Sequence, residues 1–471
     1  MSSLLHSAII KAYWRLLPLL FLSYIIAYVD RNNVSLAKLK MINDLPSFHY
    51  RTETIFALGH VVFFIGYLLL EIPGTLIVEK WSARKWICRI MITWGIIASL
   101  TAIVTQPWHF YLIRFLLGLA EAGFFPGVVV YLTHWFPTQA RARAFSLFFI
   151  AAPIAQFISP KISYYFLRMN TIENGIYYRT LFKLKGWQWM YIIWGIPAVI
   201  LGIVILFFLT DRPKDANWLS KEECRVLETE LSIELVRGQI VGGHLTLFQA
   251  LRHIKVLLLG IAYFFIVTGN YGVDLFLPTI LRDWYHLNDG LLTWLLMIPP
   301  FGALIGMLII GFSSDRTKER RFHTAIPILI GAIGLGLTLI RQQSLITMII
   351  LFTIASIGTK AYLPAFWSLP SLFLSESAAA GSIGLINSIG SIGGGVGPII
   401  LGVFKDRTGS FFLGILLLSI SMCLTSVIIM ILRFDRYHQQ ELHKSTQQLT
   451  MSNKNQELII SIRETENSTK L

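Results

Sequence analysis

Long apolar runs of helical length recur along most of the sequence and leave few ways for the chain to fold in water. Each run is close to the roughly 20 residues that an α-helix needs to cross a membrane. Of the 471 residues, 55% are hydrophobic and only 14% are charged, whereas about 25% of the residues in an average soluble domain are charged. We therefore expect an all-α polytopic membrane protein. The first run resembles those that follow, so we interpret it as a retained span rather than a signal peptide.

Twelve of these runs are expected to be membrane spans. They fall near residues 12–37, 51–78, 84–104, 108–134, 139–167, 188–210, 254–281, 290–312, 322–342, 345–373, 378–404 and 409–433. The expected domains are a six-helix half at 1–210, a cytoplasmic linker at 211–253, a second six-helix half at 254–433 and a polar cytoplasmic tail at 434–471. Many transporters consist of two similar halves with a substrate site between them near the middle of the membrane.

The charge of the chain indicates its orientation. In a membrane protein, lysine and arginine mark the short loops that stay in the cytoplasm, so the formal net charge of +14 does not require a nucleic-acid partner. Basic residues follow the second, fourth and eighth runs, and include Arg84, Arg141 and Arg320. We therefore expect those loops and both termini in the cytoplasm. The segment 161–187, expected on the outer side, is also basic and argues against this orientation.

The first run carries charged residues where a membrane helix is normally apolar. Asp30 and Arg31 are adjacent, and Asn32 and Asn33 follow them. A charge at the centre of a membrane helix costs roughly 2.5–3.5 kcal/mol to insert, so we interpret this stretch as the working site of a transporter. The alternative is that the helix ends at Asp30 and that its charges lie at the water interface.

A second pair of charges supports this interpretation. Arg114 and Glu121 are seven residues apart in the fourth run and would share one face of a helix. If that face meets Asp30 and Arg31, two arginines and two carboxylates enclose one polar cavity. Guanidinium groups can grip a carboxylate with two hydrogen bonds, so the arginines suit an anionic substrate. Desolvation and the arginines act on the carboxylates in opposite directions, which suits groups that gain and lose a proton. The alternative is a salt-bridge network that only orients the helices.

Further polar residues in the runs are candidates for substrate contact. His60 and Tyr67 share a face of the second run, although His60 could equally be a packing residue. Asp274 and Lys360 carry opposite charges in the seventh and tenth runs. We expect them to form a pair that faces the cavity, where a second cation could hold a dicarboxylate or a zwitterion. The alternative is that Lys360 reaches towards the water interface.

A short charged pattern occurs once in each half. Glu79 and Lys80 follow the second run, with Arg84 beyond them, and Asp315 and Arg316 follow the eighth run. An acid–base pair that recurs at half of the chain length suggests an internal repeat. Taken singly, each loop could be an ordinary basic anchor.

Several segments resemble one family of transporters. They are YVDRNNVSLAK (28–38), FFIGYLLLEIPG (63–74), ARKWICRIMITWGI (83–96), RFLLGLAEAGFFPG (114–127), YLTHWFP (131–137), GWQW (186–189), DRPKDANWLSKEE (211–223), FWSLP (366–370) and INSIGSIGGGVGP (386–398). Together they are similar to the major facilitator superfamily, and within it to the bacterial tartrate, phthalate and hydroxyphenylacetate permeases of the anion:cation symporter branch. The resemblance extends to about residue 433 and implies a multi-pass protein of the bacterial inner membrane.

The resemblance also implies roles for individual residues. Arg31 would bind the substrate anion, Asp30 and Glu121 would carry protons, and Arg114 would be the partner that changes its pairing. Tyr67, Trp367 and Asn387 match site positions of the family. The conformational gates would be formed by Glu79, Lys80, Arg84, Asp315 and Arg316.

Some positions depart from the family pattern. Ser82 stands where the loop motif usually has glycine, Trp194 where many relatives have glutamate, and His60 where a small residue is expected. Gln156 falls about one turn from the glutamine position of the family. Asp274 and Lys360 also depart from the pattern, so we expect them to affect specificity.

We therefore expect a secondary transporter that takes up a small organic anion together with protons. Proton-independent exchange or facilitated diffusion remains an alternative, as does a membrane sensor that binds without transporting. An enzyme is the weakest hypothesis, because the spans contain no evident metal-ligand cluster or pairing of nucleophile and base. Cys88, Cys224 and Cys423 suggest neither a disulfide framework nor a metal site. We expect no cofactor other than the proton gradient, and a monomer.

Overall fold

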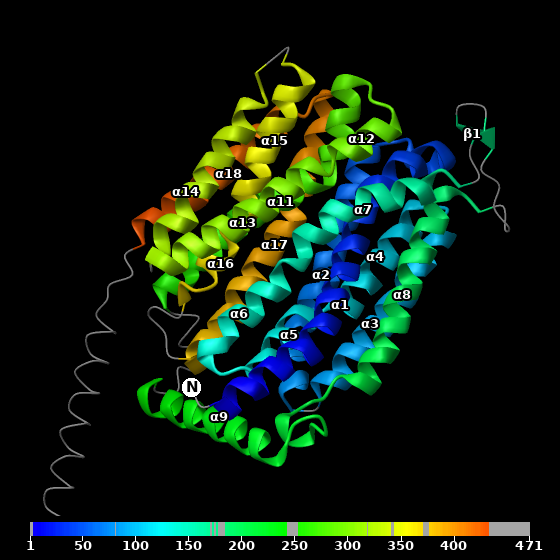
Figure 1. Cartoon of the computed structure of the whole chain (residues 1–471). Helices are drawn as coiled ribbons and strands as arrows, with labels where there is room; N and C mark the ends of the chain where they lie inside the picture. Colours follow the sequence, from blue (N-terminus) through cyan, green and yellow to red (C-terminus); the bar gives the residue numbers. More distant parts are fainter. Residues whose placement is uncertain are drawn as a thin grey trace, which may run out of the picture.

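The computed structural model describes residues 3–80, 82–169, 172–173, 176–177, 184–242, 253–317, 319–340, 343–370 and 376–432. Their helices form one elongated bundle (Figure 1). The helices of the first half are α1 (Ser3–Asp44), α2 (Thr52–Lys80), α3 (Ala83–Leu100), α4 (Pro107–Glu121), α5 (Phe124–Thr133), α6 (Thr138–Phe149), α7 (Ala151–Leu167) and α8 (Gly186–Phe208). The strands β1 (Ile172–Glu173) and β2 (Ile176–Tyr177) form a small antiparallel pair between α7 and α8.

The linker and the second half continue this helical architecture. The linker contains the 3-10 turn η3 (Pro213–Asp215) and the helix α9 (Lys221–Gly242). The helices of the second half are α11 (Ile254–Tyr285), α12 (Asp289–Leu295), α13 (Ile298–Thr317), α14 (Arg321–Leu337), α15 (Leu345–Lys360), α16 (Leu363–Phe366), α17 (Glu376–Thr408) and α18 (Phe412–Ile431). Short 3-10 turns, η1 (Pro46–Phe48) and η2 (Thr101–Ile103), follow α1 and α3.

The predicted all-α membrane class is confirmed. Within the described residues, ten helical segments are long and apolar enough to cross a membrane, and α14 is a shorter apolar helix. The helices α4 and α5 are separated at Gly123, whose φ of 80° lies in the left-handed region that glycine adopts readily. The count of twelve spans stays a prediction, since it requires α4 with α5 to act as one broken span and α14 as another.

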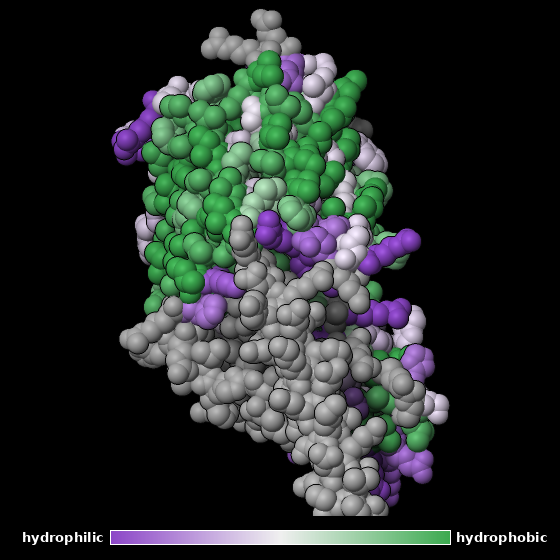
Figure 2. All heavy atoms as spheres, turned by 90° about the vertical axis from the view of Figure 1, so that its left-hand side faces the viewer, coloured by the Kyte–Doolittle hydropathy of each residue, from purple (hydrophilic) through white to green (hydrophobic). Residues whose placement is uncertain are grey.

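The outer surface of the bundle has the composition expected for contact with lipid. On α14, the exposed large side chains recur every three or four residues, at Ile326, Ile330, Ile333 and Leu337. Figure 2 shows that the side of the molecule on the left of Figure 1 is mainly hydrophobic between hydrophilic ends. A surface of this kind is stable in a bilayer but not in water.

The helices pack into two groups that meet along a central interface. In the first group, α3 packs on α8 and α2 on α4; in the second, α11 packs on α17, and α14 on α15 and α18. Between the groups, α2 packs on α17, α1 on α11 and α7 on α13. The predicted domain boundaries at 210, 253 and 433 remain a proposal, because residues 243–252 and 433–471 lie outside the described residues.

The linker helix α9 fixes one end of the bundle. It crosses the lower end in Figure 1, beside the N-terminus. Lys11 Nζ of α1 lies 2.7 Å from Glu223 Oε1 of α9, and Ser7 donates a hydrogen bond to the same oxygen at 2.7 Å. These contacts hold the pKa of Glu223 well below its usual range, at about 2. We refer below to this end as the α9 end and to the opposite end as the distal end.

The long first helix decides between the two interpretations of Asp30 and Arg31. Helix α1 continues from Ser3 to Asp44 without interruption, and Asp30 is only 5% exposed. The alternative in which the helix ends at Asp30 is therefore wrong. Both charges lie inside the bundle, where each needs a compensating partner.

A close crossing of α2 and α4 helps to position α4, which carries the buried residues Arg114 and Glu121. A Cβ atom added at Gly118 would lie 2.0 Å from the carbonyl oxygen of Phe63, and one added at Gly66 would lie 2.4 Å from that of Phe115. Backbone atoms cannot yield as a flexible side chain can. Small residues at such crossings let membrane helices approach closely.

We predict that Gly118→Ala destabilises the protein, because the added methyl group must push α2 and α4 apart. The cost should be about 1–3 kcal/mol, as for other overpacked sites, and should appear as a lower apparent melting temperature in detergent. Gly384→Ala is the matched control, since a Cβ there meets nothing within 4 Å. Equal melting temperatures for the two variants would contradict the close crossing.

Candidate functional site

Arg31 is the centre of the candidate site. Its Nη2 atom forms an ion pair with Glu121 of α4, and its Nη1 atom donates a hydrogen bond to the Tyr271 hydroxyl of α11 at 3.1 Å. The guanidinium carbon lies 5.6 Å from the ring centre of Tyr28 and 5.9 Å from that of Tyr67. One arginine of the first half therefore contacts a carboxylate of its own half and a hydroxyl of the other half.

The break between α4 and α5 places Glu121. Glu121 is the last residue of α4, and its side chain is buried. A carboxylate at the C-terminal end of a helix meets the negative end of the helix dipole, which is unfavourable. The guanidinium group of Arg31 supplies the positive charge that compensates for both.

The other two predicted charges lie near this ion pair but have different partners. Asp30 Oδ2 accepts a hydrogen bond from Trp94 Nε1 of α3 at 3.0 Å, whereas Oδ1 is buried and has no hydrogen-bond partner in the described part of the chain. Arg114 is 3% exposed, and its guanidinium carbon lies 4.7 Å from the ring centre of Phe63. Among the described residues, no carboxylate lies within ion-pair distance of Arg114. The two arginines and two carboxylates thus form one buried cluster in which a single ion pair is made.

The second charged pair expected from the sequence is formed by α11 and α15. Lys360 Nζ lies 3.1 Å from Asp274 Oδ1. Gln156 Nε2, on α7 of the first half, donates a hydrogen bond to Asp274 Oδ2 at 3.1 Å. The carboxylate of Asp274 is therefore shared by donors from both halves.

A small cavity is lined by one member of each charged pair, Arg31 and Asp274. Its volume is about 20 Å³, which is room for roughly one water molecule. The lining residues are Tyr28, Arg31, Asn32, Ser35, His60, Gln156, Asn270, Tyr271, Asp274 and Leu275. The cavity must enlarge before an organic molecule can enter it.

The remaining predicted substrate residues differ in how close they lie to this cavity. The Trp367 ring is 5.1 Å from that of Tyr263 and 6.4 Å from that of Phe125, so it belongs to an aromatic contact between the halves. Asn387 Nδ2 of α17 donates a hydrogen bond to Glu71 Oε1 of α2 at 2.5 Å. His60 lines the cavity and Tyr67 lies beside Arg31.

Glu71 is a buried carboxylate that the sequence reasoning missed. It is 3% exposed, and Ser388 of α17 donates a second hydrogen bond to it at 3.1 Å. The signal was available as the glutamate within the apolar segment FFIGYLLLEIPG (63–74). Glu71 joins the two halves directly.

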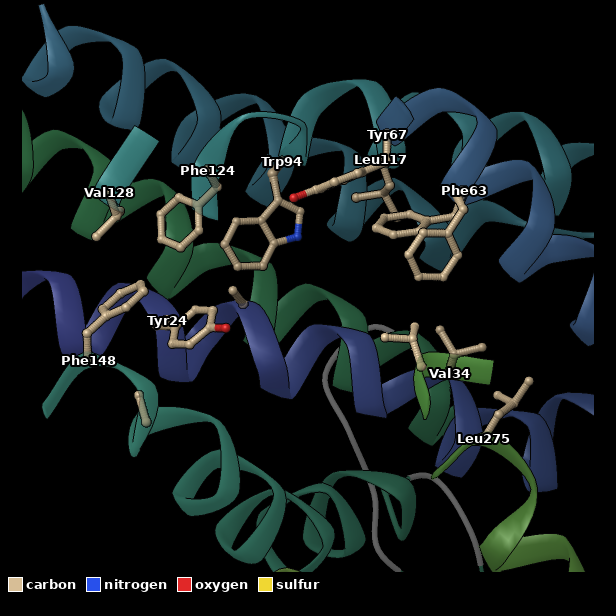
Figure 3. Close-up of a cluster of buried hydrophobic side chains, with 14 of the residues drawn as sticks. Tyr24, Val34, Phe63, Tyr67, Trp94, Leu117, Phe124, Val128, Phe148 and Leu275 are labelled. Carbon is tan, nitrogen blue, oxygen red and sulfur yellow. The ribbon is translucent and has the colours of Figure 1, made fainter. Parts of the chain in front are cut away.

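Aromatic side chains close the space between the cavity and the α9 end. The rings of Tyr24 and Phe148 are stacked 4.3 Å apart, and Tyr24 also contacts Tyr28 edge-on at 4.9 Å. Figure 3 shows Tyr24 of α1 beside Phe148, with Trp94 and Phe124 approaching from the facing helices. The Trp367–Phe125 contact continues this aromatic layer across the interface of the halves.

Polar contacts close the distal end. Lys40 of α1 pairs with Asp289 of α12 at 2.5 Å, and the backbone amide of Thr54 donates to Asp406 of α17 at 2.7 Å. Lys38, which is completely buried, forms an ion pair with Glu53 and lies 4.3 Å from the ring centre of Phe276. The sequence reasoning missed this buried pair. The cavity is therefore enclosed from both ends.

The structure describes the side chains of only some of the predicted gating residues. Arg84 is present at the start of α3, where its backbone amide donates to Asp211 Oδ1 at 2.9 Å and Ser82 donates to Asp211 Oδ2 at 2.7 Å. The side chains of Glu79, Lys80 and Asp315 lie outside the described residues, and Arg316 is exposed. In the described part of the loop, the acid that holds the start of α3 is Asp211, which the sequence reasoning did not single out.

A metal centre does not account for this cluster. Within the described residues, no three histidine, cysteine, aspartate or glutamate side chains gather in a way that could hold a metal ion. The polar groups of the site instead consist of two cation–carboxylate pairs and hydrogen-bonding side chains.

Comparison with known proteins identifies the family. The family model described as Major Facilitator Superfamily matches this chain twice, over residues 20–398 and over residues 259–465. The chain belongs to the Major Facilitator Superfamily. It is therefore a membrane transporter for a small molecule rather than an enzyme.

Three bacterial transporters are similar to this chain over most of its length. A putative tartrate transporter of Agrobacterium vitis is 39% identical over 422 residues, which cover 90% of each chain. The putative metabolite transport protein NicT of Pseudomonas putida is 39% identical over 87% of this chain and 92% of its own. The inner membrane transport protein RhmT of Escherichia coli is 33% identical over 92% of this chain and 97% of its own. The sequence resemblance to the superfamily and to tartrate permeases is confirmed.

A solved structure gives the same result for the fold. The xylose transporter XylE from E. coli, in a partially occluded inward open conformation, matches with a TM-score of 0.69. The match covers 89% of this chain and 98% of XylE at 14% identity. Because the sequence identity is low, the match shows only that the two proteins share one fold.

We predict that Lys38→Met destabilises this transporter by about 3–5 kcal/mol, because it leaves the buried carboxylate of Glu53 without its counter-charge. The double variant Lys38→Met with Glu53→Leu should recover most of that loss, since it removes both charges. The control is Lys40→Met, whose pair with Asp289 is partly exposed and should cost at most about 1 kcal/mol. Apparent melting temperatures in detergent measure the order of stability of these variants. A double variant no more stable than the single one would refute the pairing.

Proposed function

We propose that this transporter imports a small organic anion together with protons by alternating access. The observation that carries the proposal is the ion pair of Arg31 with Glu121 beside the cavity between the halves. Glu121 occupies the guanidinium group that a substrate carboxylate would otherwise bind. Protonation of Glu121 would weaken this pair and release Arg31, so binding of the anion and uptake of a proton become linked.

Four residues would share this coupling. Arg31 would hold the substrate carboxylate, for which a guanidinium group is suited because it can donate two parallel hydrogen bonds. Glu121 and Asp30 would carry protons. Arg114 has no ion-pair partner among the described residues. It would form an ion pair with whichever carboxylate is ionised after Arg31 changes partner.

The surrounding side chains would shape the rest of the pocket. Tyr67 and Trp367 would contact the substrate skeleton, and Asn387 and His60 would offer hydrogen bonds. One N–H of the Asn387 amide is already donated to Glu71, so the substrate would use its second N–H or displace Glu71 from the first. Asp274 and Lys360 would complete the site from the second half.

The proposed cycle uses the closed ends of the bundle. We assign the α9 end to the cytoplasm, because basic loops mark that side, and the distal end to the outside of a bacterial inner membrane. Both termini would then be cytoplasmic, in a monomer of twelve spans with domain boundaries at 210, 253 and 433. Support for the location comes from the relatives, of which one is an inner membrane transport protein of E. coli.

The gates would alternate between these ends. Opening outward would require the Lys40–Asp289 pair and the Thr54–Asp406 contact to separate. Opening inward would require the aromatic layer at Trp367 to separate, together with the loops of Glu79, Lys80, Arg84, Asp315 and Arg316. The names of the relatives include a tartrate transporter, which supports an organic acid as substrate.

Coupling to protons has an electrostatic reason. Importing an anion against a membrane potential that is negative inside costs roughly 2.3 kcal/mol per charge for each 100 mV. Protons that enter with the anion cancel or reverse this cost. The candidate carriers, Asp30 and Glu121, both lie in the buried cluster and are 5% and 2% exposed.

We predict that Asp30→Asn and Glu121→Gln abolish uptake driven by an inward proton gradient but retain exchange of labelled substrate, because the neutral residues mimic the protonated state. Arg31→Ala should lower both activities by about tenfold or more, as expected for the loss of a charge-assisted hydrogen bond. The measurement is uptake and counterflow in proteoliposomes with a panel of carboxylic acids.

The control and the opposing outcomes separate the alternatives. Glu222→Gln, an exposed residue of the linker helix, should behave as the wild type. If the gradient accelerates uptake of none of the acids while exchange persists, the chain is an exchanger or facilitator. If neither activity is found although acids bind, the sensor hypothesis is favoured.

A further inference from the structure

We propose that Lys360, with Asp274 and Gln156, forms a second anion subsite, so that the substrate is a small dicarboxylate held by Arg31 at one end and by Lys360 at the other. This inference rests on the proposed function and specifies its substrate class. It assigns to the second half of the chain a cation whose role matches that of Arg31 in the first half.

The two cations converge on one face of α11. Arg31 contacts Tyr271, and Lys360 contacts Asp274. Tyr271 and Asp274 are three residues apart on the same helix, so their side chains are neighbours on its surface. Both residues line the cavity, as do Arg31 and Gln156. A molecule that enters between Arg31 and Tyr271 therefore lies beside the Asp274–Lys360 pair.

Each cation already holds a carboxylate of the protein. Glu121 occupies Arg31, and Asp274 occupies Lys360. These resident carboxylates show that each cation is placed to receive a carboxylate oxygen. A substrate with two carboxylates would replace both residents, whereas a substrate with one carboxylate would leave the Asp274–Lys360 pair in place.

The alternative of a lysine that reaches towards water does not fit the geometry. Lys360 ends α15 and is only 7% exposed, and its ammonium group lies 3.1 Å from Asp274. The C-terminal end of a helix also favours a positive charge. The side chain is thus fixed inside the bundle at a position where a cation is stable.

The contact of Gln156 distinguishes a binding subsite from a pair that only joins two helices. Asp274 and Lys360 both belong to the second half, and their pair alone would be complete within that half. Gln156 comes from the first half and donates to the second carboxylate oxygen. The pair consequently lies at the interface that must rearrange during transport. When the substrate takes Lys360, Asp274 keeps the amide of Gln156 as a donor.

The test compares acids that share a skeleton but differ in one charge. Proteoliposomes with an inward proton gradient are given phthalate or benzoate, and succinate or its monoamide. The wild type should take up at least one dicarboxylate about tenfold or more faster than its singly charged partner, as expected when one charged hydrogen-bond partner is lost. Lys360→Met should remove this preference, whereas Lys360→Arg should retain it.

Two further variants protect the test against misfolding. Lys360→Met leaves Asp274 without its cation, so the double variant with Asp274→Asn is tested alongside it and should fold because both charges are removed. It should transport the singly charged acids and show no preference for dicarboxylates. Lys405→Met is the matched control, because its pair with Asp283 is also formed within the second half but lies at the distal surface. This control should keep the preference of the wild type.

The outcomes separate this inference from the proposed function. Proton-driven uptake of singly charged acids by the wild type, with no preference for dicarboxylates, would overturn the second subsite and leave the proposed function standing. An unchanged preference in the double variant would also overturn it. If the proton gradient accelerates uptake of no acid in the panel, the proposed function itself fails.

Discussion

The ion pair between Arg31 and Glu121 is the interaction on which the rest of the site depends. Charges inside the bundle are costly unless each has a partner of opposite sign. Arg31 has a carboxylate, a tyrosine hydroxyl and aromatic ring faces around it. A change in the protonation of Glu121 alters the largest of these contributions. The remaining contacts of Arg31 then determine the orientation of its guanidinium group.

The interface between the halves is held mainly by contacts that can be exchanged. Lipid tails are as apolar as leucine side chains, so packing and hydrogen bonds, rather than the hydrophobic effect, hold membrane helices together. In this chain, the cross-interface hydrogen bonds include those of Glu71 with Asn387, Gln156 with Asp274 and Arg31 with Tyr271. Each includes an ionisable or strongly polar side chain whose partner a substrate or a proton could replace. The interface is therefore stable in the closed state without being permanent.

Helical periodicity in the sequence predicted that Arg114 and Glu121 share one face of a helix, and the opposite charges of Asp274 and Lys360 within apolar runs suggested that they pair. It could not predict how each helix is rotated against its neighbours. Trp94 and Glu71 were missed for this reason, since their partners are 64 and 316 residues away in the chain. The break after Glu121 was also missed, because an apolar run that contains Gly123 is equally compatible with one continuous helix. Side-chain contacts between distant helices depend on packing that no local pattern encodes.

The position of each distal ion pair relative to the interface bears on how the closed state can open. The Lys38–Glu53 pair joins α1 to α2 within the first half and is buried, so separating its two charges would be costly, and the pair can stay intact when the halves separate. The Lys40–Asp289 pair crosses the interface, but its side chains are 31% and 24% exposed, and pairs in contact with water contribute only about 0–1 kcal/mol. A pair that is costly to break thus lies within the first half, while a pair that is easily broken connects it to the second half. A transporter that must open and close many times requires this distribution of stability.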